Sequence, residues 1–448
     1  MYKADIQLTP KNIDEILKAD ATGRNKDINL LLRFLSSLQT KQDGAWSIAV
    51  DGDWGSGKTF FVKQCQYVLD ITSSTSDNKK NIDFTNIDTT TINKHNFKTV
   101  YFDAWTHDSE EDPLVSILKS MISTNWSLSS KETLKSLFKA GEILINFLSG
   151  VNLSNLTELL DTEKSNLDKL KIDFDKALSK LTPEDGKLII FVDELDRCKP
   201  TYAVKVLERI KHYFNNDKII FIFSTNLYQL QNTVKRYYGE GFDGYSYLGR
   251  FFDTIFAIPE PDIEKYIEYK KSLLPSEIYN KSTFIYSFIL DLIRNFSFSV
   301  RQINHLCLQI NSATYNLIAS LSNNGIYSDS SFGRSLIYQF ILPFMCALKQ
   351  NSITDYNSFI NGKASSETLN LLSNSSALYS YFRMKVDTNK IDVKSEIEKL
   401  YHMIFTDNFT SKDAEVLIMD VVYIEYPQRY KKKLIKACSL FDDNVKYD

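Results

Sequence analysis

The segment at residues 52–59 has the residue types and spacing of a phosphate-binding loop. It reads GDWGSGKT and fits the pattern G-x-x-x-x-G-K-[ST] at every fixed position. Gly52 and Gly57 allow backbone angles and close approaches that a Cβ atom would prevent, so that successive N–H groups can face an anion. Lys58 supplies a positive charge for the β- and γ-phosphates of a nucleotide, and the Thr59 hydroxyl can ligate Mg²⁺. The alternative is a glycine turn that binds nothing.

The residues on either side favour the binding interpretation. An apolar run precedes the loop and a helix-forming run follows it, as a phosphate site at a helix N-terminus requires. The predicted ligand is ATP with Mg²⁺, and the predicted contacts are Gly52, Asp53, Trp54, Gly55, Ser56, Gly57, Lys58, Thr59 and Phe60. Within this set, Trp54 is expected to support the loop rather than to touch the ligand.

A second group of polar residues ends the run LIIFVDELDRC at 188–198. Acids that end a strand lie at the carboxyl edge of a parallel sheet, where ligands bind. Asp193 is predicted to hold Mg²⁺ through a water, and Glu194 to orient or deprotonate the attacking water. The division of that work between Glu194 and Asp196 stays open. A solvated helix start with N-terminal acids is the alternative.

A third polar site follows the apolar run at 219–223. The sequence FIFSTN ends in Asn226, which is a candidate for contact with the γ-phosphate or the water, with Thr225 as its substitute. Asparagine is also a preferred N-cap residue, and a helix-forming segment begins directly after it. Both interpretations of Asn226 therefore stay open.

Five short apolar runs are expected to be the strands that carry these side chains: 47–50, 99–102, 188–192, 219–223 and 254–258. The third and fourth runs are apolar throughout, which is typical of strands covered on both faces in a parallel sheet. Helical spacing separates these two runs, with apolar residues at Ala203, Val206, Leu207, Ile210 and Phe214. The alternation predicts a doubly wound α/β domain over about residues 45–260.

The composition excludes several other classes of protein. The 448 residues are 43% hydrophobic and carry a formal net charge of −3, so no basic field points to nucleic acid or to a membrane surface. Five scattered cysteines without a CxxC pair favour a reducing cytoplasm over a disulfide scaffold. The charged N-terminus lacks the apolar core of a signal peptide, and the stretch 143–157 is too short and too polar for a membrane span. We therefore expect a cytoplasmic protein without a membrane segment.

The motifs and their order resemble the KAP family of P-loop NTPases, a STAND-related branch. The matching stretches are DATGRNKDINLLLRFL (20–35), GDWGSGKT (52–59), VYFDAWTHDSEEDP (100–113), FVDELDRCKP (191–200), YLGRFFDTIFAIPEP (247–261) and FSFSVRQINHL (296–306). The resemblance implies a P-loop NTPase fold with a parallel five-stranded sheet in the order 5-1-4-3-2. It also implies a position for Arg24 near the adenine, and a setting in bacterial defence against phages or plasmids. The family often has two aspartates where this chain has Asp193 and Glu194.

Two arginines are candidate sensors of the nucleotide. Arg250 lies just before the fifth predicted strand, from where it is predicted to reach the γ-phosphate of a neighbouring subunit. Arg301 resembles the lid-helix arginine that senses the nucleotide in related ATPases. The alternative for both is a surface charge or a partner for a carboxylate of the same chain.

The remaining sequence predicts helices around the α/β domain. We expect an N-terminal arm (1–19), a P-loop domain (20–262) with a helical insertion (114–182), a helical lid (263–325) and a C-terminal helical module (326–448). In the insertion, heptad spacing relates Leu156, Leu160, Leu167, Leu170, Phe174, Ala177 and Leu181, interrupted by Glu163. A long helix laid against its own domain is favoured over an arm that pairs with a partner or a second copy.

Three classes of function fit these observations. The favoured one is a regulatory ATPase whose nucleotide state controls self-association or a partner protein. A motor that acts on nucleic acid is the first alternative, and neither the net charge nor an aromatic and basic stripe supports it. A scaffold with slow nucleotide turnover is the second. ATP turnover with and without DNA or RNA separates the three.

Overall fold

The structure is a computed structural model that describes residues 9–38, 44–73, 83–92, 96–124, 128–150, 160–183, 186–214, 216–270, 284–322, 336–384, 392–406, 415–418, 422–425 and 428–439. The chain divides into two compact units, which meet in sequence between Asp262 and Ile263. The described residues up to Asp262 form the first unit, which holds the phosphate loop, and those from Ile263 onward form the second.

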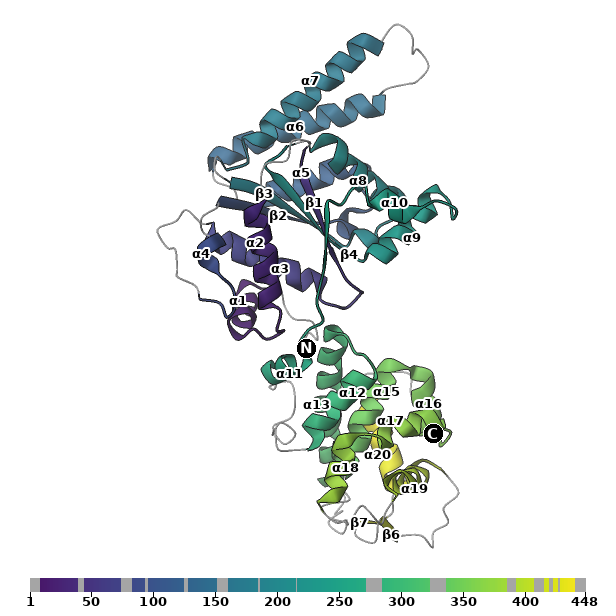
Figure 1. The fold of residues 1–448 in the computed structure, drawn as a ribbon. Coiled ribbons are helices and arrows are strands. Elements are labelled where there is room, and N and C mark those ends of the chain that lie inside the picture. The colour runs from purple at the N-terminus through teal and green to yellow at the C-terminus, as the bar shows by residue number, and fades with distance from the viewer. Residues whose placement is uncertain are drawn as a thin grey trace. The chain divides into compact units, whose positions relative to one another are not determined.

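A five-stranded parallel sheet lies at the centre of the first unit (Figure 1). Its strands are β1 (Trp46–Asp51), β2 (Asn96–Asp103), β3 (Gly186–Asp193), β4 (Ile219–Thr225) and β5 (Thr254–Ala257). They are ordered β2-β3-β4-β1-β5, and every pairing is parallel. This topology confirms the predicted P-loop NTPase fold and the strand order 5-1-4-3-2.

The register brings the carboxyl ends of the strands to one edge. Asp193 is paired with Asp103 on one side and with Ser224 on the other, and Asp51 is paired with Thr225. Because parallel strands end at the same edge, the acids of β3 and the residues after β1 must lie close together. The fold therefore brings the phosphate loop and the acids that follow β3 to the same edge of the sheet.

Helices cover both faces of the sheet. Alternate residues of each buried strand point to opposite sides, and apolar residues on both sides are packed against helices. On one face, Ile189, Phe191 and Ile222 share a core with α1 (Pro10–Ala19), α2 (Asn25–Ser37), α3 (Lys58–Thr72) and α4 (Thr89–Ile92). On the other face, the core includes α5 (Pro113–Ser123), α6 (Leu128–Gly150), α7 (Leu160–Ser179), α8 (Pro200–Tyr213), α9 (Leu227–Tyr238) and α10 (Gly244–Leu248). The short helix α4 lies in a polar stretch where the sequence predicted no element.

The helix predicted between β3 and β4 is α8. Its apolar face is buried in one core, as the spacing predicted: Ala203, Val206, Leu207 and Ile210, followed by Phe214. At its N-terminus, Pro200 occupies the first helical position, where the missing N–H costs nothing. This helix shares a hydrophobic core with β3 and β4.

Helices α6 and α7 run antiparallel to each other as a hairpin within the predicted insertion (Figure 1). The C-terminal half of α7 packs on its own unit, where the Phe174 ring meets the Phe214 ring edge-on at 5.6 Å between centroids. Leu178 and Leu181 are fully buried in the same core. Of the predicted heptad positions, Leu156 and the side chains of Leu160, Glu163 and Leu167 lie outside the described residues.

The second unit is built mainly of helices around one hydrophobic core, which extends from Tyr266 to Ala437. Its elements are α11 (Ile263–Tyr269), α12 (Phe284–Asn295), α13 (Val300–Ser322), a π-helical turn (Ile337–Ile341), α15 (Leu342–Asn351), α16 (Ile353–Ile360), α17 (Ser366–Ser373), α18 (Ser376–Arg383), α19 (Val393–Phe405), β6 (Glu415–Ile418), β7 (Val422–Glu425) and α20 (Gln428–Cys438). The antiparallel hairpin β6–β7 was not predicted from the sequence. None of the described helices combines the length and the apolar composition that crossing a membrane requires.

Candidate nucleotide site

The phosphate loop connects β1 to the N-terminus of α3, and its glycines are required by its shape. Gly55 and Gly57 have positive φ values of 85° and 88°, in the left-handed region that favours glycine. A Cβ atom on Gly52 would lie 2.3 Å from Cγ2 of Ile258, so no side chain fits there. A glycine-rich backbone of this kind, followed directly by the start of α3, is typical of loops that present N–H groups to an anion.

Lys58 is held at the centre of this loop. Its ammonium group donates hydrogen bonds to the carbonyl oxygens of Gly52 at 2.7 Å and Asp53 at 3.0 Å. Burial lowers the pKa of Lys58, while the carboxylates of Asp196 and Asp193 raise it. A buried cation of this kind, held beside the N-terminus of a helix, fits a triphosphate that supplies the missing negative charge.

Asp193 ends β3 and is almost fully buried, with 1% of its surface exposed. Its Oδ1 accepts the backbone N–H of Glu194 at 2.9 Å, and its Oδ2 accepts the hydroxyl of Tyr101 at 2.7 Å. Burial and the Asp193 carboxylate raise the pKa of Tyr101, so its hydroxyl remains a donor. The carboxylate of Asp193 is thus fixed by two donors from different segments.

Glu194 lies next to Asp193 in an unusual backbone conformation, with φ at 60° and ψ at 25°. Few residues other than glycine adopt this left-handed geometry, and strain of this kind is concentrated at functional sites. The carboxylate of Glu194 forms an ion pair with the guanidinium group of Arg197. Burial raises the pKa of Glu194 to about 7, with Arg197 opposing the rise and Asp193 adding to it. A carboxyl with this pKa is suited to accept a proton near neutral pH.

Asp196 lies in the turn after Glu194 and connects β3 to the phosphate loop. Its Oδ2 accepts the indole N–H of Trp54 at 2.5 Å, and its Oδ1 accepts the hydroxyl of Thr225 at 3.1 Å. The Trp54 side chain is nevertheless 55% exposed. Through Asp196, the phosphate loop, the end of β3 and the end of β4 are joined by two hydrogen bonds.

Asn226 is the N-cap of α9, one of the two interpretations that the sequence left open, and it also contacts the phosphate loop. Its Oδ1 accepts the backbone N–H of Gln229 at 3.0 Å and so caps α9. Its Nδ2 donates to the carboxylate of Asp53 in the phosphate loop at 3.2 Å. The cap therefore fixes an amide group that reaches the loop.

Arg24 lies against the phosphate loop with only 2% of its surface exposed. Its Nη1 donates to the carbonyl oxygen of Ser56 at 2.8 Å, and its Nη2 donates to the carbonyl oxygen of Pro259. Burial lowers the pKa of Arg24 to about 10, a value at which it still carries its charge. Two of its donors are thus used on the backbone of the loop and of the segment after β5.

The other predicted site residues lie in three different parts of the chain. Thr59 and Phe60 are in the first turn of α3, directly after Lys58. Arg250 follows α10 and is exposed, and its side chain has no hydrogen bond or ion pair to the part of the chain that the structure describes. Arg301 is in the first turn of α13, in the second unit.

Mg²⁺ is bound in proteins by oxygen donors, commonly one or two carboxylates together with substrate phosphates. The Thr59 hydroxyl and the Asp193 carboxylate are donors of this type, and Asp193 is buried and oriented by its two hydrogen bonds. Across the described ranges, no group of three or more His, Cys, Asp and Glu side chains is arranged to hold a metal by itself. The donor set therefore fits a Mg²⁺ ion that shares its coordination with a nucleotide.

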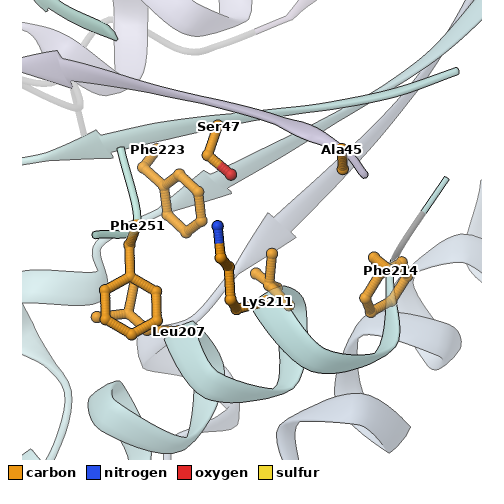
Figure 2. Close-up of a pocket in the computed structure, with 8 residues that line it drawn as sticks. Ala45, Ser47, Leu207, Lys211, Phe214, Phe223 and Phe251 are labelled. Atoms are coloured by element: carbon orange, nitrogen blue, oxygen red, sulfur yellow. The ribbon is translucent and has the colours of Figure 1, made fainter. Parts of the chain in front are cut away.

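A small hollow lies apart from this site, near the start of β1 and against α8. Its volume is about 30 Å³, enough for a water molecule and far too small for a nucleotide. Figure 2 shows its aromatic lining and the ammonium group of Lys211 directed toward it. Its lining residues are Ala45, Ser47, Leu207, Ile210, Lys211, Phe214, Phe223 and Phe251.

Three residues near the site were missed by the sequence reasoning: Tyr101, Lys63 and Arg197. Tyr101 lies within a predicted strand, where an aromatic residue is ordinary, and Lys63 lies within a helix. Tyr101 and Arg197 lie in stretches that resemble family motifs, VYFDAW and FVDELDRCKP, and Lys63 had no such signal.

Residues 25–317 match the family model described as the KAP family P-loop domain. The match covers well over half of the chain and includes the phosphate loop, the acids after β3 and Arg250 and Arg301. No curated protein matches the chain.

Proposed function

The chain belongs to the KAP family of P-loop NTPases, and from this premise we propose that it binds ATP with Mg²⁺ and hydrolyses it. The observation that carries the proposal is the convergence of the phosphate loop with the acids at and just after the end of β3. The two are in direct contact through the 2.5 Å hydrogen bond between Trp54 and Asp196. A loop that holds phosphates and a carboxylate suited to accept a proton are the two parts that hydrolysis needs.

Each side chain has a distinct role in this proposal. Lys58 exchanges its hydrogen bonds to the loop carbonyls for the β- and γ-phosphates. Thr59 and Asp193 would hold Mg²⁺, which neutralises charge on the phosphates when it is bound. Asn226, fixed by its cap on α9, is placed to contact the γ-phosphate or the water.

We assign the proton acceptor to Glu194 rather than to Asp196. The Asp196 carboxylate links Trp54 of the phosphate loop to Thr225 at the end of β4, so we assign it to holding the loop in place. Glu194 is engaged by Arg197, and its pKa of about 7 matches the operating range of a general base.

Release of inorganic phosphate from ATP tests this proposal. We expect release in the presence of Mg²⁺ and none after chelation with EDTA, because Thr59 and Asp193 would hold a Mg²⁺ ion that offsets the charge of the phosphates. The same preparation, returned to excess Mg²⁺, should recover its rate. Release that persists with EDTA would remove Thr59 and Asp193 from the proposed roles.

The wider role that we propose is regulatory. ATP binding and hydrolysis would control self-association or a partner protein, in a bacterial defence system against phages or plasmids. The resemblance of the motifs to the KAP family supports this setting, and the free cysteines fit a cytoplasmic location. The net charge of −3 gives no support to a motor on nucleic acid.

Arg250 provides a test of the link to assembly. Its exposed side chain, without a partner among the described residues, is available to a neighbouring subunit. We expect ATP to promote an oligomer and specific activity to rise with protein concentration, because an arginine from the neighbour stabilises charge on the γ-phosphate. Arg250→Ala should remove most of that rise and leave ATP affinity nearly unchanged.

Sedimentation with a non-hydrolysable ATP analogue, together with activity at several protein concentrations, measures both effects. Arg236→Ala on α9 is a matched control, since Arg236 is an exposed arginine of the same unit. A protein that stays monomeric with the analogue, with turnover independent of concentration, would contradict the assembly model.

A further inference from the structure

Tyr101 is connected to the nucleotide site through Asp193. Its hydroxyl donates to Oδ2 of Asp193 at 2.7 Å, while the backbone N–H of Glu194 donates to Oδ1 at 2.9 Å. Each carboxylate oxygen has two lone pairs, so each keeps one for a further ligand after these bonds are made. Two donors therefore fix the direction in which Asp193 presents its remaining lone pairs.

The register of the sheet explains this contact. Tyr101 is paired with Phe191, and because alternate residues of a strand share a face, Tyr101 and Asp193 lie on the same side of the sheet. Asp103 is paired directly with Asp193 on that side. A tyrosine hydroxyl in this position supplies a hydrogen-bond donor between two neighbouring strands that both end in an acid.

The Tyr101 ring is in turn held from α3, the helix that begins at the phosphate loop. The ammonium group of Lys63 lies 2.9 Å from the ring centroid, within the range of a cation–π contact. Lys63 donates to Gln66 at 3.4 Å, and Gln66 donates to the hydroxyl of Thr99 on β2 at 3.1 Å. A polar network between α3 and β2 thus sets the position of the ring.

We propose that Tyr101 is a positioning residue for the metal of the nucleotide site, and that Lys63 holds it in place. The Tyr101 hydroxyl orients the Asp193 carboxylate toward a Mg²⁺ ion that arrives with the nucleotide. Lys63, which contacts the Tyr101 ring, is on the helix that starts at the phosphate loop. The contact between Lys63 and Tyr101 therefore aligns the Asp193 carboxylate with the phosphates. This inference rests on the proposed role of Asp193 as a metal residue.

Tyr101→Phe tests the inference, since it removes the hydroxyl and keeps the ring over Lys63. The measurement is the binding of Mn²⁺, in place of Mg²⁺, to the full chain with a non-hydrolysable ATP analogue, followed by electron paramagnetic resonance. We expect the Mn²⁺ affinity to fall about 10-fold or more, as is typical when a group that orients a metal ligand is lost. Affinity for the analogue without metal should stay unchanged.

Two further variants make the result specific. Tyr67 is on α3, as Lys63 is, and its hydroxyl donates to Asp14 at 3.3 Å. Tyr67→Phe removes this hydroxyl and should leave Mn²⁺ affinity unchanged. Lys63→Met keeps the Tyr101 hydroxyl but removes the cation over its ring, and a smaller loss of Mn²⁺ affinity in the same direction is expected. This variant also tests the inference if Tyr101→Phe fails to fold.

The possible outcomes separate this inference from the proposed function. If Tyr101→Phe binds Mn²⁺ as the wild type does and only unfolds at a lower temperature, the hydrogen bond from Tyr101 to Asp193 is purely structural. That result would overturn this inference and leave the proposed function untouched. A wild-type chain that binds the analogue but no Mn²⁺ would overturn the metal role of Asp193, and the inference with it. Hydrolysis is not needed for either result.

Discussion

Lys58→Ala is expected to abolish measurable ATP binding while leaving the fold intact. In the absence of a ligand, the Lys58 ammonium group donates hydrogen bonds to two loop carbonyls, at 2.7 Å and 3.0 Å. With ATP bound, the same group makes charge-assisted contacts to two phosphates, and these are the strongest hydrogen bonds that the loop offers. Losing them should weaken binding at least about 100-fold. Calorimetric titration with Mg·ATP measures the effect.

A control variant separates loss of binding from loss of structure. Lys176→Ala on α7 removes an exposed lysine outside the site and should bind ATP as the wild type does. The unfolding temperature of Lys58→Ala should remain close to that of the wild type, because burial of Lys58 already disfavours its charge. Unchanged ATP affinity in folded Lys58→Ala would contradict the assignment of the phosphate loop.

Glu194→Gln is expected to bind Mg·ATP normally and to turn it over at least about 100-fold more slowly, as for the loss of a general base. Glutamine has nearly the same shape and can still accept a hydrogen bond from Arg197, but it cannot take a proton from water. Single-turnover phosphate release, measured beside ATP affinity, separates the chemical step from binding. Wild-type turnover in this variant would move the base to Asp196 or elsewhere.

Heat stability without nucleotide provides a control on Glu194 itself. Burial raises its pKa from 4.5 to about 7 in the folded chain, so ionisation costs stability as the pH rises from about 4.5 to 7. Glutamine does not ionise. Glu194→Gln should therefore unfold at a higher temperature than the wild type at pH 8, and this difference should shrink toward zero as the pH falls to 4.5. A variant that is less stable at both pH values would indicate a structural role for the carboxylate.

The sheet was predictable because its central strands have a strong local signal. All residues of β4 are buried, and a run of apolar residues is what a strand covered on both faces requires. The loop at Gly52 and Gly57 was recognisable for a related reason, since its backbone geometry tolerates few other residues. The short strands β6 and β7 carry no comparable pattern, and they lie in a module predicted to be helical.

The contacts within the site were less predictable, because they depend on tertiary arrangement. The hydrogen bond from Tyr101 to Asp193 depends on the register of β2 against β3. Neither strand's sequence specifies that register. The hydrogen bonds from Arg24 to Ser56 and Pro259 join segments far apart in the chain. Sequence motifs identified the phosphate loop, the acids that follow β3 and Asn226, which contact one another, but they did not single out Tyr101.

The proposed ATPase activity is measured as phosphate release from ATP by the wild-type chain, with and without added DNA or RNA. We expect Mg²⁺-dependent release that nucleic acid leaves unchanged and that falls to background in Lys58→Ala. Release that requires DNA or RNA, release that persists in Lys58→Ala, or no release at all from the wild type would contradict it.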